Sequence, residues 1–363
     1  MSGWEDLTPG VGHAGQALIY ASAGMEAILL VGGLGTRLRP LTDEVPKPML
    51  PVAGVPLVVH QIARARAAGV DHVVLATSYR AQIFADALGD GSRLGVSIDY
   101  AVEEEPLGTG GAIRNAAEYL GDDPVLVFNG DVVDGHDITA QVGLHMDRHA
   151  DATLYLTTVE DARPYGCVPT DGTGRVTDFH EKMPDPVSDQ VNAGCYVLQR
   201  AVIDDIPAGR AVSVERETFP GLLVAGRLVL GAVDAAYWRD LGTPEAYVQG
   251  CADVVLGLVD APARPGPAGE SLVLAGADVS PSAVLCGGTS VGTGCVIGDR
   301  ARVDGSVLFD GASIESDAVV RASAVGHKAR VGARAFLDGV IVPDGMDVPA
   351  DARPSAGSRL TVG

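Results

Sequence analysis

Short apolar runs alternate with amphipathic segments from residue 25 to about residue 258. Residues 27–31 form a continuous apolar run, which is typical of a strand buried on both faces of a parallel sheet. The alternation favours an α/β domain with a mainly parallel sheet and right-handed helical crossovers. It predicts strands at residues 27–31, 73–77, 98–102, 125–128, 153–159, 175–179, 192–198 and 228–233, and helices at residues 56–68, 81–88, 111–120 and from residue 243 or 244 onward.

Beyond residue 270 the apolar positions follow a different period. Three successive hexads start at Val291, Ile297 and Val303, and later hexads start at Ile314, Val325 and Val331. A six-residue period is typical of a parallel β-helix, in which stacked coils bury the aliphatic residues that one coil alone leaves exposed. The pattern predicts a short left-handed β-helix of about three coils, with irregular insertions near Phe309 and Ala322. A small irregular β domain is the alternative.

A proline-rich stretch at residues 260–269 separates the two patterns. We therefore expect an N-terminal extension at residues 1–24, an α/β domain at 25–258, a linker at 259–270, the β-helix at 271–345 and a tail at 346–363. The extension carries Glu5 and Asp6 where a secretory signal carries basic residues, so it does not resemble a targeting segment. Met25 directly precedes the first strand and is an alternative start of translation to Met1.

Composition and charge narrow the class of partner. The chain has 363 residues, a net charge of −21 and a pI of about 4.6, which argues against binding to nucleic acid or to an anionic membrane surface. Its five cysteines lack zinc-ligand spacing, and we expect them to be reduced in a cytoplasmic protein. No apolar run reaches the roughly 18 residues of a membrane span.

A glycine turn with two nearby cations follows the first strand. Gly32, Gly33 and Gly35 allow backbone N–H groups to approach a ligand closely, and Arg37 and Lys47 follow them. The spacing does not match a Walker loop, because no Lys-Ser or Lys-Thr pair closes the glycine run. It does not match a dinucleotide-binding fingerprint either, because the chain lacks the third glycine of that motif. The stretch predicts a polyphosphate cradle, with an ordinary glycine turn as the alternative.

The string from Glu26 to Pro51, with its G-G-L-G-T-R and V-P-K-P motifs, resembles the signature of the sugar-nucleotide pyrophosphorylases. The resemblance implies a Rossmann-like nucleotidyltransferase domain that joins a nucleoside triphosphate to a sugar 1-phosphate with the aid of Mg²⁺. It implies catalytic roles for Arg37, Lys47 and Asp131, and metal ligation by Asp131 and Asp240. Because both reactants are anionic, such a reaction depends on positioning and charge neutralisation.

The same resemblance implies one set of contacts to the nucleotide and another to the sugar phosphate. Local sequence leaves other roles open: packing for Tyr79, turn capping for Asp131, and helix capping or a helix-start carboxylate for Asp240 and Glu215. A Met183-Pro184 pair follows Lys182, where the family usually has proline directly. The nucleotide contacts are Gly32, Gly33, Gly35, Thr36, Arg37, Tyr79, Gly108 and Thr109, and the sugar-phosphate contacts are Gly130, Glu181, Lys182, Asn192, Gly194 and Glu215.

Within the family, the V-N-A-G, S-V-E-R-E and Y-W-R-D-L-G-T-P motifs are most similar to those of mannose-1-phosphate guanylyltransferases. The resemblance implies synthesis of GDP-mannose and pyrophosphate from GTP and mannose 1-phosphate. Guanylyl transfer to a heptose or cyclitol phosphate, thymidylyl or uridylyl transfer to glucose 1-phosphate, and a non-catalytic regulatory paralogue are the alternatives. His327 leaves open an added acyltransferase activity, and we expect the β-helix to mediate formation of a dimer or larger homo-oligomer.

Overall fold

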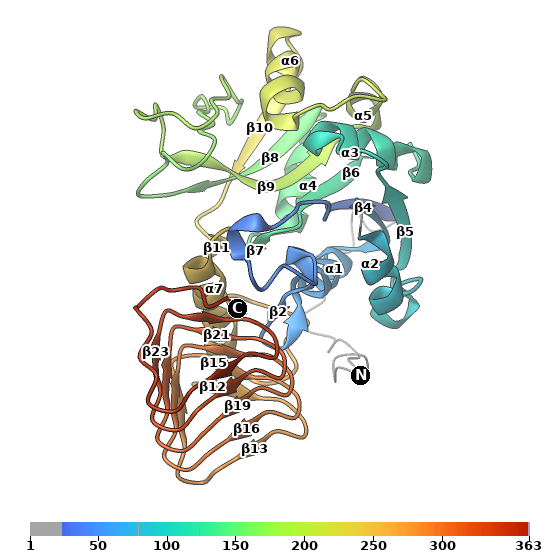
Figure 1. The fold of residues 1–363 in the computed structure, drawn as a ribbon. Helices are drawn as coiled ribbons and strands as arrows, with labels where there is room; N and C mark the ends of the chain where they lie inside the picture. The colour runs from blue at the N-terminus through green and yellow to red at the C-terminus, as the bar shows by residue number, and fades with distance from the viewer. Residues whose placement is uncertain (1–23, 79, 123, 362–363) are drawn as a thin grey trace. The chain divides into compact units, whose positions relative to one another are not determined.

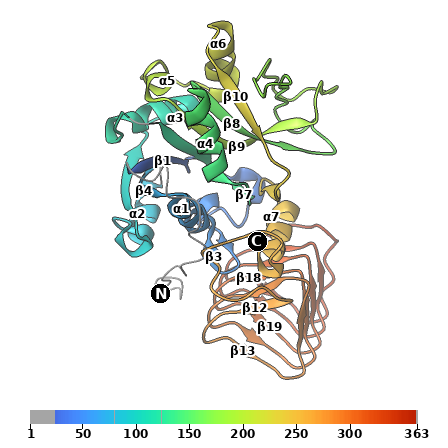
Figure 2. The same cartoon turned by 180° about the vertical axis from the view of Figure 1, so that it is seen from behind.

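The structure is a computed structural model that describes residues 24–78, 80–122 and 124–361 (Figures 1 and 2). Its described residues divide into two units that interleave along the chain. One, here called the sheet unit, contains the chain up to Gly33 and Gln61–Trp238. The other, here called the β-helix unit, contains Leu34–His60 and the chain from Arg239 onward. The predicted N-terminal extension, apart from Gly24, lies outside the described residues.

The sheet unit is built on a seven-stranded mixed sheet, which confirms the predicted fold class. β1 pairs in parallel with β4 and β6, β4 with β5, and β8 with β10, whereas β9 is antiparallel to both β6 and β8. Six of the strands therefore run in one direction, as in a doubly wound sheet, and β9 lies antiparallel between their two parts. In sheet order the strands are β10 (Val229–Val233), β8 (Ala152–Thr158), β9 (Gln190–Leu198), β6 (Val125–Asn129), β1 (Met25–Leu30), β4 (Val70–Thr77) and β5 (Ser97–Val102).

Helices cover the sheet and bury its apolar runs. α3 (Gly108–Ala116) packs against β1, β4 and β5, and α4 (Ile138–Arg148) packs against β8, β9 and β10. The main core gathers fully buried side chains such as Ile28, Ile113 and Phe219. The other elements are α1 (Leu57–Ala67), α2 (Ala81–Leu88), η3 (Ser92–Leu94), η4 (Ala117–Tyr119), β7 (Val132–Asp134), α5 (Arg200–Asp204), the π-helix η5 (Val214–Thr218), α6 (Phe219–Val224) and β11 (Trp238–Asp240).

The β-helix unit contains three parallel sheets of five, five and four strands. Figure 1 shows successive coils stacked on one another, with β13, β16 and β19 in sequence along the stack. The first sheet is β12 (Ser271–Val273), β15 (Thr289–Val291), β18 (Val307–Leu308), β21 (Ala324–Val325) and β24 (Ile341–Val342). The second is β13 (Asp278–Val279), β16 (Val296–Ile297), β19 (Ser313–Ile314), β22 (Arg330–Val331) and β25 (Asp347–Val348), and the third is β14 (Val284–Cys286), β17 (Arg302–Asp304), β20 (Val319–Arg321) and β23 (Phe336–Asp338).

The predicted β-helix is confirmed, but the estimate of about three coils is too low. From Val291 onward the buried aliphatic residues of its core follow spacings of 6, 6 and 5 residues, so one coil takes 17 residues, whereas the first coil takes the 18 residues of three full hexads. A strict six-residue reading loses register at each shortened step, which made Phe309 and Ala322 look like insertions. The inward positions are Val291, Ile297, Val303, Leu308, Ile314, Val320, Val325, Val331, Leu337, Val342 and Val348.

The signature segment and a long helix belong to the same unit as the β-helix. α7 (Pro244–Leu256) packs against β12, β15 and β18 and against β2 (Pro51–Val52), which pairs with β3 (Val55–Pro56). The Tyr247 hydroxyl donates to the Pro51 carbonyl at 2.6 Å. The segment that carries Arg37 and Lys47, with η1 (Thr36–Leu38) and η2 (Lys47–Met49), is therefore in one unit with the β-helix core.

Two local predictions are wrong. Residues 175–179 form isolated bridges, Thr170 to Val176 and Arg175 to Leu230, where a strand was expected. α3 begins at Gly108, three residues before the predicted start, although glycine is a poor helix former. The backbone N–H groups of Gly110 and Gly111 donate to the Val212 carbonyl, so tertiary packing overrides the low propensity of this glycine-rich turn. In the described part of the chain, no helix is both long and apolar enough to cross a bilayer.

Candidate functional site

The signature loop of the β-helix unit is closed by its own short contacts. Gly35 adopts a left-handed conformation with φ of 59°, which favours glycine because a side chain there is strained. The Thr42 hydroxyl donates to the Gly35 carbonyl at 2.8 Å. A Cβ at Gly35 would lie 3.1 Å from the Cβ of Lys47, so the glycine also allows the lysine backbone to approach.

Three predicted site residues of this unit come together around Gly242. Arg37 Nη2 and Asp240 Oδ2 lie 2.9 and 2.8 Å from the position that a Cβ on Gly242 would take. Lys47 Nζ lies 3.7 Å from Asp240 Oδ1, and only 7% of the lysine is exposed. Two cations from the signature segment are thus held beside one aspartate that is almost 200 positions away in the sequence.

The helix-capping alternative for Asp240 is wrong. Thr243 is the N-cap of α7, and its hydroxyl accepts from the Ala246 N–H at 3.2 Å. Pro244 occupies the first turn, where its missing N–H costs nothing. The carboxylate of Asp240 is therefore not used to begin the helix.

In the sheet unit, two predicted backbone turns lie at the ends of β1 and β6. Ser78 donates its hydroxyl to the Gly32 carbonyl at 3.0 Å, while no described atom beyond its chain neighbours lies within 4 Å of a Cβ built on Gly33. The Gly130 N–H donates to the Leu30 carbonyl at 3.0 Å, which ties the turn before Asp131 to the end of β1. Because β1 and β6 are parallel neighbours, Gly32 and Asp131 follow the same edge of the sheet.

Thr109 and Glu215 contact each other directly. The Thr109 hydroxyl donates to Glu215 Oε2 at 2.8 Å and accepts from the Val214 N–H at 2.9 Å. A Cβ on Gly108 would lie 2.7 Å from the Val212 carbonyl oxygen, so the glycine permits this close packing. A predicted nucleotide residue and a predicted sugar residue, 106 positions apart, are therefore joined by one hydrogen bond.

Glu181, the residue before Lys182, lies next to the short π-helix η5, which carries Glu215. Glu181 Oε1 is 3.6 Å from Arg216 Nε, and the Lys182 N–H donates to Glu181 Oε2 at 3.2 Å. Glu215 is in the first turn of that helix, whose N-cap is Ser213. The helix-start alternative for Glu215 is thus correct in position, but the carboxylate also accepts from Thr109 and Ser213. π-Helical turns are frequent at functional sites.

Asn192 and Gly194 shape the middle of β9. Asn192 Nδ2 donates to the Tyr196 hydroxyl at 2.8 Å, and its Oδ1 accepts from the Gly194 N–H at 3.1 Å. Gly194 has φ of 86°, and a Cβ there would lie 2.8 Å from Asn129 Nδ2. The predicted sugar-pocket strand is therefore in close contact with the residue that precedes the Gly130–Asp131 turn.

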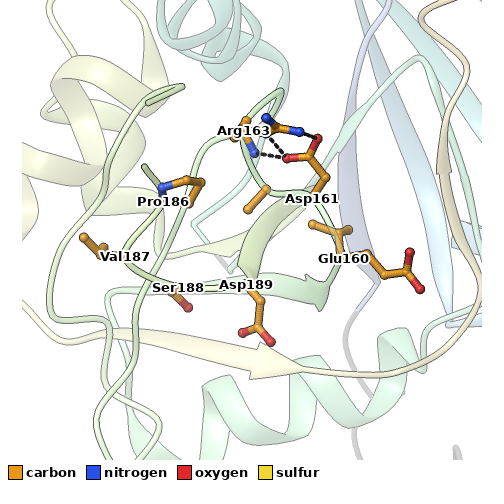
Figure 3. Close-up of a pocket in the computed structure, with 9 residues that line it drawn as sticks. Glu160, Asp161, Arg163, Pro186, Val187, Ser188 and Asp189 are labelled. Carbon is orange, nitrogen blue, oxygen red and sulfur yellow. Dashed lines mark hydrogen bonds and ion pairs between the residues drawn. The ribbon is translucent and has the colours of Figure 1, made fainter. Parts of the chain in front are cut away.

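An open pocket of about 450 Å³ lies on the sheet unit, between residues 159–163 and 186–189 (Figure 3). Arg163 and Asp161 form a two-bonded ion pair on its wall, at 2.7 Å for each bond. None of the predicted site residues lines it. The pocket is separate in sequence from the signature motifs, although it adjoins the loop that carries Glu181 and Lys182.

Sequence reasoning missed several residues that shape these contacts. Thr42 closes the signature loop, Ser213 begins the π-helix and Arg216 pairs with Glu181. Thr42, Ser213 and Arg216 all lie inside motifs that the sequence singled out, which is the signal that would have found them. Tyr79, the predicted base contact, lies outside the described residues.

Comparison with known proteins identifies the family. The model of the family described as "Nucleotidyl transferase" matches residues 26–255, and the model described as "GMPPB C-terminal domain" matches residues 268–351. The chain belongs to the nucleotidyl transferase family. This assignment confirms the resemblance carried by the signature string.

Relatives of this family match most of the chain. The chain is 54% identical over 297 residues to the mannose-1-phosphate guanylyltransferase of Mycobacterium tuberculosis, covering 82% of this chain and 83% of the relative. It is 34% identical to mannose-1-phosphate guanylyltransferase 1 of Arabidopsis thaliana, covering 82% and 85%. Among solved structures, HddC from Yersinia pseudotuberculosis complexed with GMP-PN matches 63% of this chain and 99% of its own, with a TM-score of 0.54 and 29% identity.

Nucleotidyl transferases of this family generally use a divalent metal ion. The predicted ligands Asp131 and Asp240 offer carboxylate oxygens, which suit Mg²⁺, an ion that takes one or two protein carboxylates and keeps several waters. Among the described residues, no three His, Cys, Asp or Glu side chains gather as a metal site. The available donors fit the chemistry of Mg²⁺.

Proposed function

We propose that this nucleotidyl transferase is a mannose-1-phosphate guanylyltransferase, which forms GDP-mannose and pyrophosphate from GTP and mannose 1-phosphate. The observation that carries the proposal is the 54% identity to the Mycobacterium tuberculosis enzyme over more than four fifths of both chains. The match to the GMPPB C-terminal domain over residues 268–351 supports it. The GMP-PN bound to the Yersinia relative supports a guanine nucleotide.

The reaction is an in-line attack of a mannose 1-phosphate oxygen on the α-phosphorus of GTP, with pyrophosphate leaving opposite. Gly32, Gly33, Gly35 and Thr36 line the approach of the triphosphate. Arg37 binds the departing phosphates through its two-pronged guanidinium, and Lys47 neutralises charge at the α-phosphate. Their placement beside Gly242 means that the charge is provided by groups already in position, which is how such sites lower a barrier.

Asp131 and Asp240 would hold Mg²⁺. When bound, the ion neutralises phosphate charge and polarises the phosphoryl oxygens. Asp131 is carried by the turn that follows β6, and Asp240 is carried by β11 beside Lys47. Both side chains sit on regular elements or tight turns, so the chain orients the carboxylates before substrates arrive.

The sugar phosphate meets residues from three segments. Lys182 binds the phosphate, and Glu181, Asn192 and Glu215 accept from mannose hydroxyls, while Gly130 and Gly194 allow the sugar to approach the backbone. Gly108 and Thr109 contact the nucleotide, as does Tyr79. The Thr109–Glu215 hydrogen bond then joins the loop that holds nucleotide to a residue that holds sugar.

We further infer a catalytic domain at residues 25–258, a linker at 259–270, a β-helix domain at 271–345 and a tail at 346–363. All five cysteines are free thiols, which supports a reducing compartment such as the cytoplasm. The β-helix domain is the part that we expect to join copies of the chain into a dimer or larger assembly.

Pyrophosphate release across a panel of nucleotides and sugar 1-phosphates tests the proposal. We expect the highest kcat/KM with GTP and mannose 1-phosphate, and no turnover when Mg²⁺ is removed by a chelator. Preference for dTTP or UTP with glucose 1-phosphate would replace the substrate assignment and keep the chemistry. Absence of turnover with every pair would reject the enzyme.

A further inference from the structure

One face of α1 holds the turn that carries Asp131. Gln61 and Arg64 lie one helical turn apart on α1, and both belong to the sheet unit. Their side chains donate to backbone or carboxylate groups of residues 129–136. We infer that Gln61 and Arg64 are positioning residues, which fix the Asp131 carboxylate for the divalent metal of the proposed reaction; the inference rests on the proposed function.

Gln61 spans the turn itself. Its Nε2 donates to the Asn129 carbonyl at 2.7 Å and to the Val132 carbonyl at 3.3 Å. These two carbonyls stand on either side of Gly130 and Asp131. A single buried amide, with 6% of the residue exposed, therefore fixes the distance between the two ends of the turn.

Arg64 holds the segment that follows. Its Nη1 lies 2.6 Å from Asp134 Oδ1, and its Nη2 donates to the His136 carbonyl at 3.0 Å. Asp134 Oδ1 also lies 2.6 Å from Nδ1 of His136. The last residue of β7 is therefore held by both Arg64 and His136. Gln61 and Arg64 together contact four residues of the eight-residue segment 129–136.

The amide of Gln61 is not explained by stability alone. Its Oε1 is buried, and no described atom donates to it. A buried carbonyl without a donor lowers stability, and methionine would fill about the same volume without that cost. The group that justifies glutamine here is its NH₂, whose two hydrogens reach the two carbonyls that flank the turn.

The turn has little other freedom. On its far side the Gly130 N–H is bound to the Leu30 carbonyl, and a Cβ at Gly130 would collide with that oxygen. β1 and α1 therefore hold residues 129–132 from two directions. Loss of the Gln61 contacts would free the carbonyls of Asn129 and Val132 on either side of the turn, so its backbone, and with it the Asp131 carboxylate, would sample more orientations.

Replacement of Gln61 by Met tests the inference through metal binding, with no measurement of catalytic activity. The readout is the binding of Mn²⁺ to the full chain with GTP but without sugar phosphate, measured by water-proton relaxation. We expect Q61M to bind Mn²⁺ about 10-fold more weakly or worse, since loss of a partner that orients a metal ligand weakens metal affinity by about 10–100-fold. Arg64→Lys, which loses the forked contact, should weaken binding in the same direction.

Ile62→Val is the matched control. Ile62 is the next residue on α1, is fully buried and makes no hydrogen bond to the turn, so I62V should lower the melting temperature and leave Mn²⁺ affinity unchanged. Asp131→Asn shows whether the metal is held by this aspartate. Normal Mn²⁺ affinity in Q61M, with weakened affinity in D131N, would overturn the inference and leave the proposed function intact. Normal affinity in D131N would overturn the metal assignment and the inference together, and a wild-type chain without guanylyl transfer would reject the proposed function.

Discussion

At the scale of single residues, Lys47 stands out because it is a nearly buried cation. Its ammonium lies 3.7 Å from Asp240, and its Cβ lies 3.1 Å from the position that a Cβ on Gly35 would take. Burial of an ammonium group costs free energy unless anions lie beside it. Asp240 is one such anion, and a bound phosphate would be a second. We expect Lys47→Met to lower kcat for GDP-mannose synthesis by about 10²-fold or more, in line with the loss of one transition-state donor.

The control for Lys47 is Lys328, a solvent-exposed lysine of the β-helix. K328M should retain wild-type kcat and KM. Steady-state rates in both the synthetic and the pyrophosphorolytic direction measure the effect. A K47M enzyme with nearly full activity would show that Lys47 is a structural cation.

His145 makes the fold sensitive to acid. The residue is fully buried between Thr153 and Gln199, and burial lowers its pKa from 6.5 to about 4. The unfolded chain therefore binds more protons at this site than the folded chain between these values, so stability falls as the pH drops below 6.5. At about pH 5 the loss is about 2 kcal/mol.

Urea unfolding of wild type and His145→Gln at neutral and acidic pH isolates this contribution. The buried His60, whose pKa burial likewise lowers to about 4, acts in the same direction and remains in both proteins. The variant should lose about 2 kcal/mol less than wild type on acidification. Equal losses of stability in the two proteins would mean that His145 has the same pKa in the folded and the unfolded chain.

His72 has the opposite pH dependence. Burial opposes its protonation, but hydrogen bonds with Glu26 at 2.8 Å and Asp99 at 3.0 Å raise its pKa above 6.5. The stability it adds is complete below pH 6.5 and is lost as the pH rises through the raised folded value. His72→Gln should therefore destabilise the protein more at about pH 6 than at about pH 9, as measured by denaturant unfolding. A penalty that is equal at both values would contradict the charged pair.

The sequence predicted some site residues and could not predict others, for a reason visible at this scale. Gly35, Arg37 and Lys47 lie in one short string, so their spacing alone indicates phosphate chemistry. Gln61 acts on a partner 68 positions away, and no local pattern encodes that contact. Thr109 and Glu215 were both predicted as site residues, but the hydrogen bond between them, across 106 positions, was not.

At the scale of elements, β9 is shaped by one glycine. Gly194 lies inside the strand with φ of 86°, and its missing side chain leaves room for Asn129. We expect Gly194→Ala to strain β9 and push Asn129, which lowers kcat/KM by about 10-fold or more because the Gly130–Asp131 turn follows directly.

Gly209→Ala is the matched substitution for Gly194. Gly209 also has a positive φ, of 72°, and no described atom beyond its chain neighbours lies within 4 Å of a Cβ there. G209A should share the backbone strain without the collision. Similar kcat/KM values for the two variants would show that the contact with Asn129 is not what matters.

Elements whose signal is internal were predicted well, and those that depend on partners were not. α2 has the predicted bounds, since its helical face is complete in its own sequence. Residues 175–179 have strand-forming side chains but meet β10 only at Arg175 and Leu230, so no ladder forms. α3 starts early because Val212 accepts from its glycines. The β-helix period was found, but from Val291 onward each coil is one residue shorter than three hexads, which a strict six-residue period does not show.

At the scale of the whole chain, the two ends of the β-helix differ. Near its C-terminal end, β24 is met by the chain's own tail: Ile341 bridges to Arg359, and the Leu360 N–H donates to the Ile341 carbonyl. At the other end, β12, β13 and β14 are each the last strand of their sheet. Val273 and Val284 are 44% and 47% exposed there, and the core side chains Val279 and Leu285 are only partly buried.

A strand edge that no strand of the described residues pairs with, beside a partly buried apolar core, is a surface through which such a coil can associate. We therefore expect the protein to be a dimer or larger at micromolar concentration by light scattering, and Leu285→Asp to shift it toward monomer because a carboxylate cannot be buried there unpaired. Val224→Asp provides the control: Val224 is 90% exposed at the end of α6, so its charge should leave the mass unchanged. A wild-type monomer would exclude association, and an L285D protein of undiminished mass would place the contact away from this first coil.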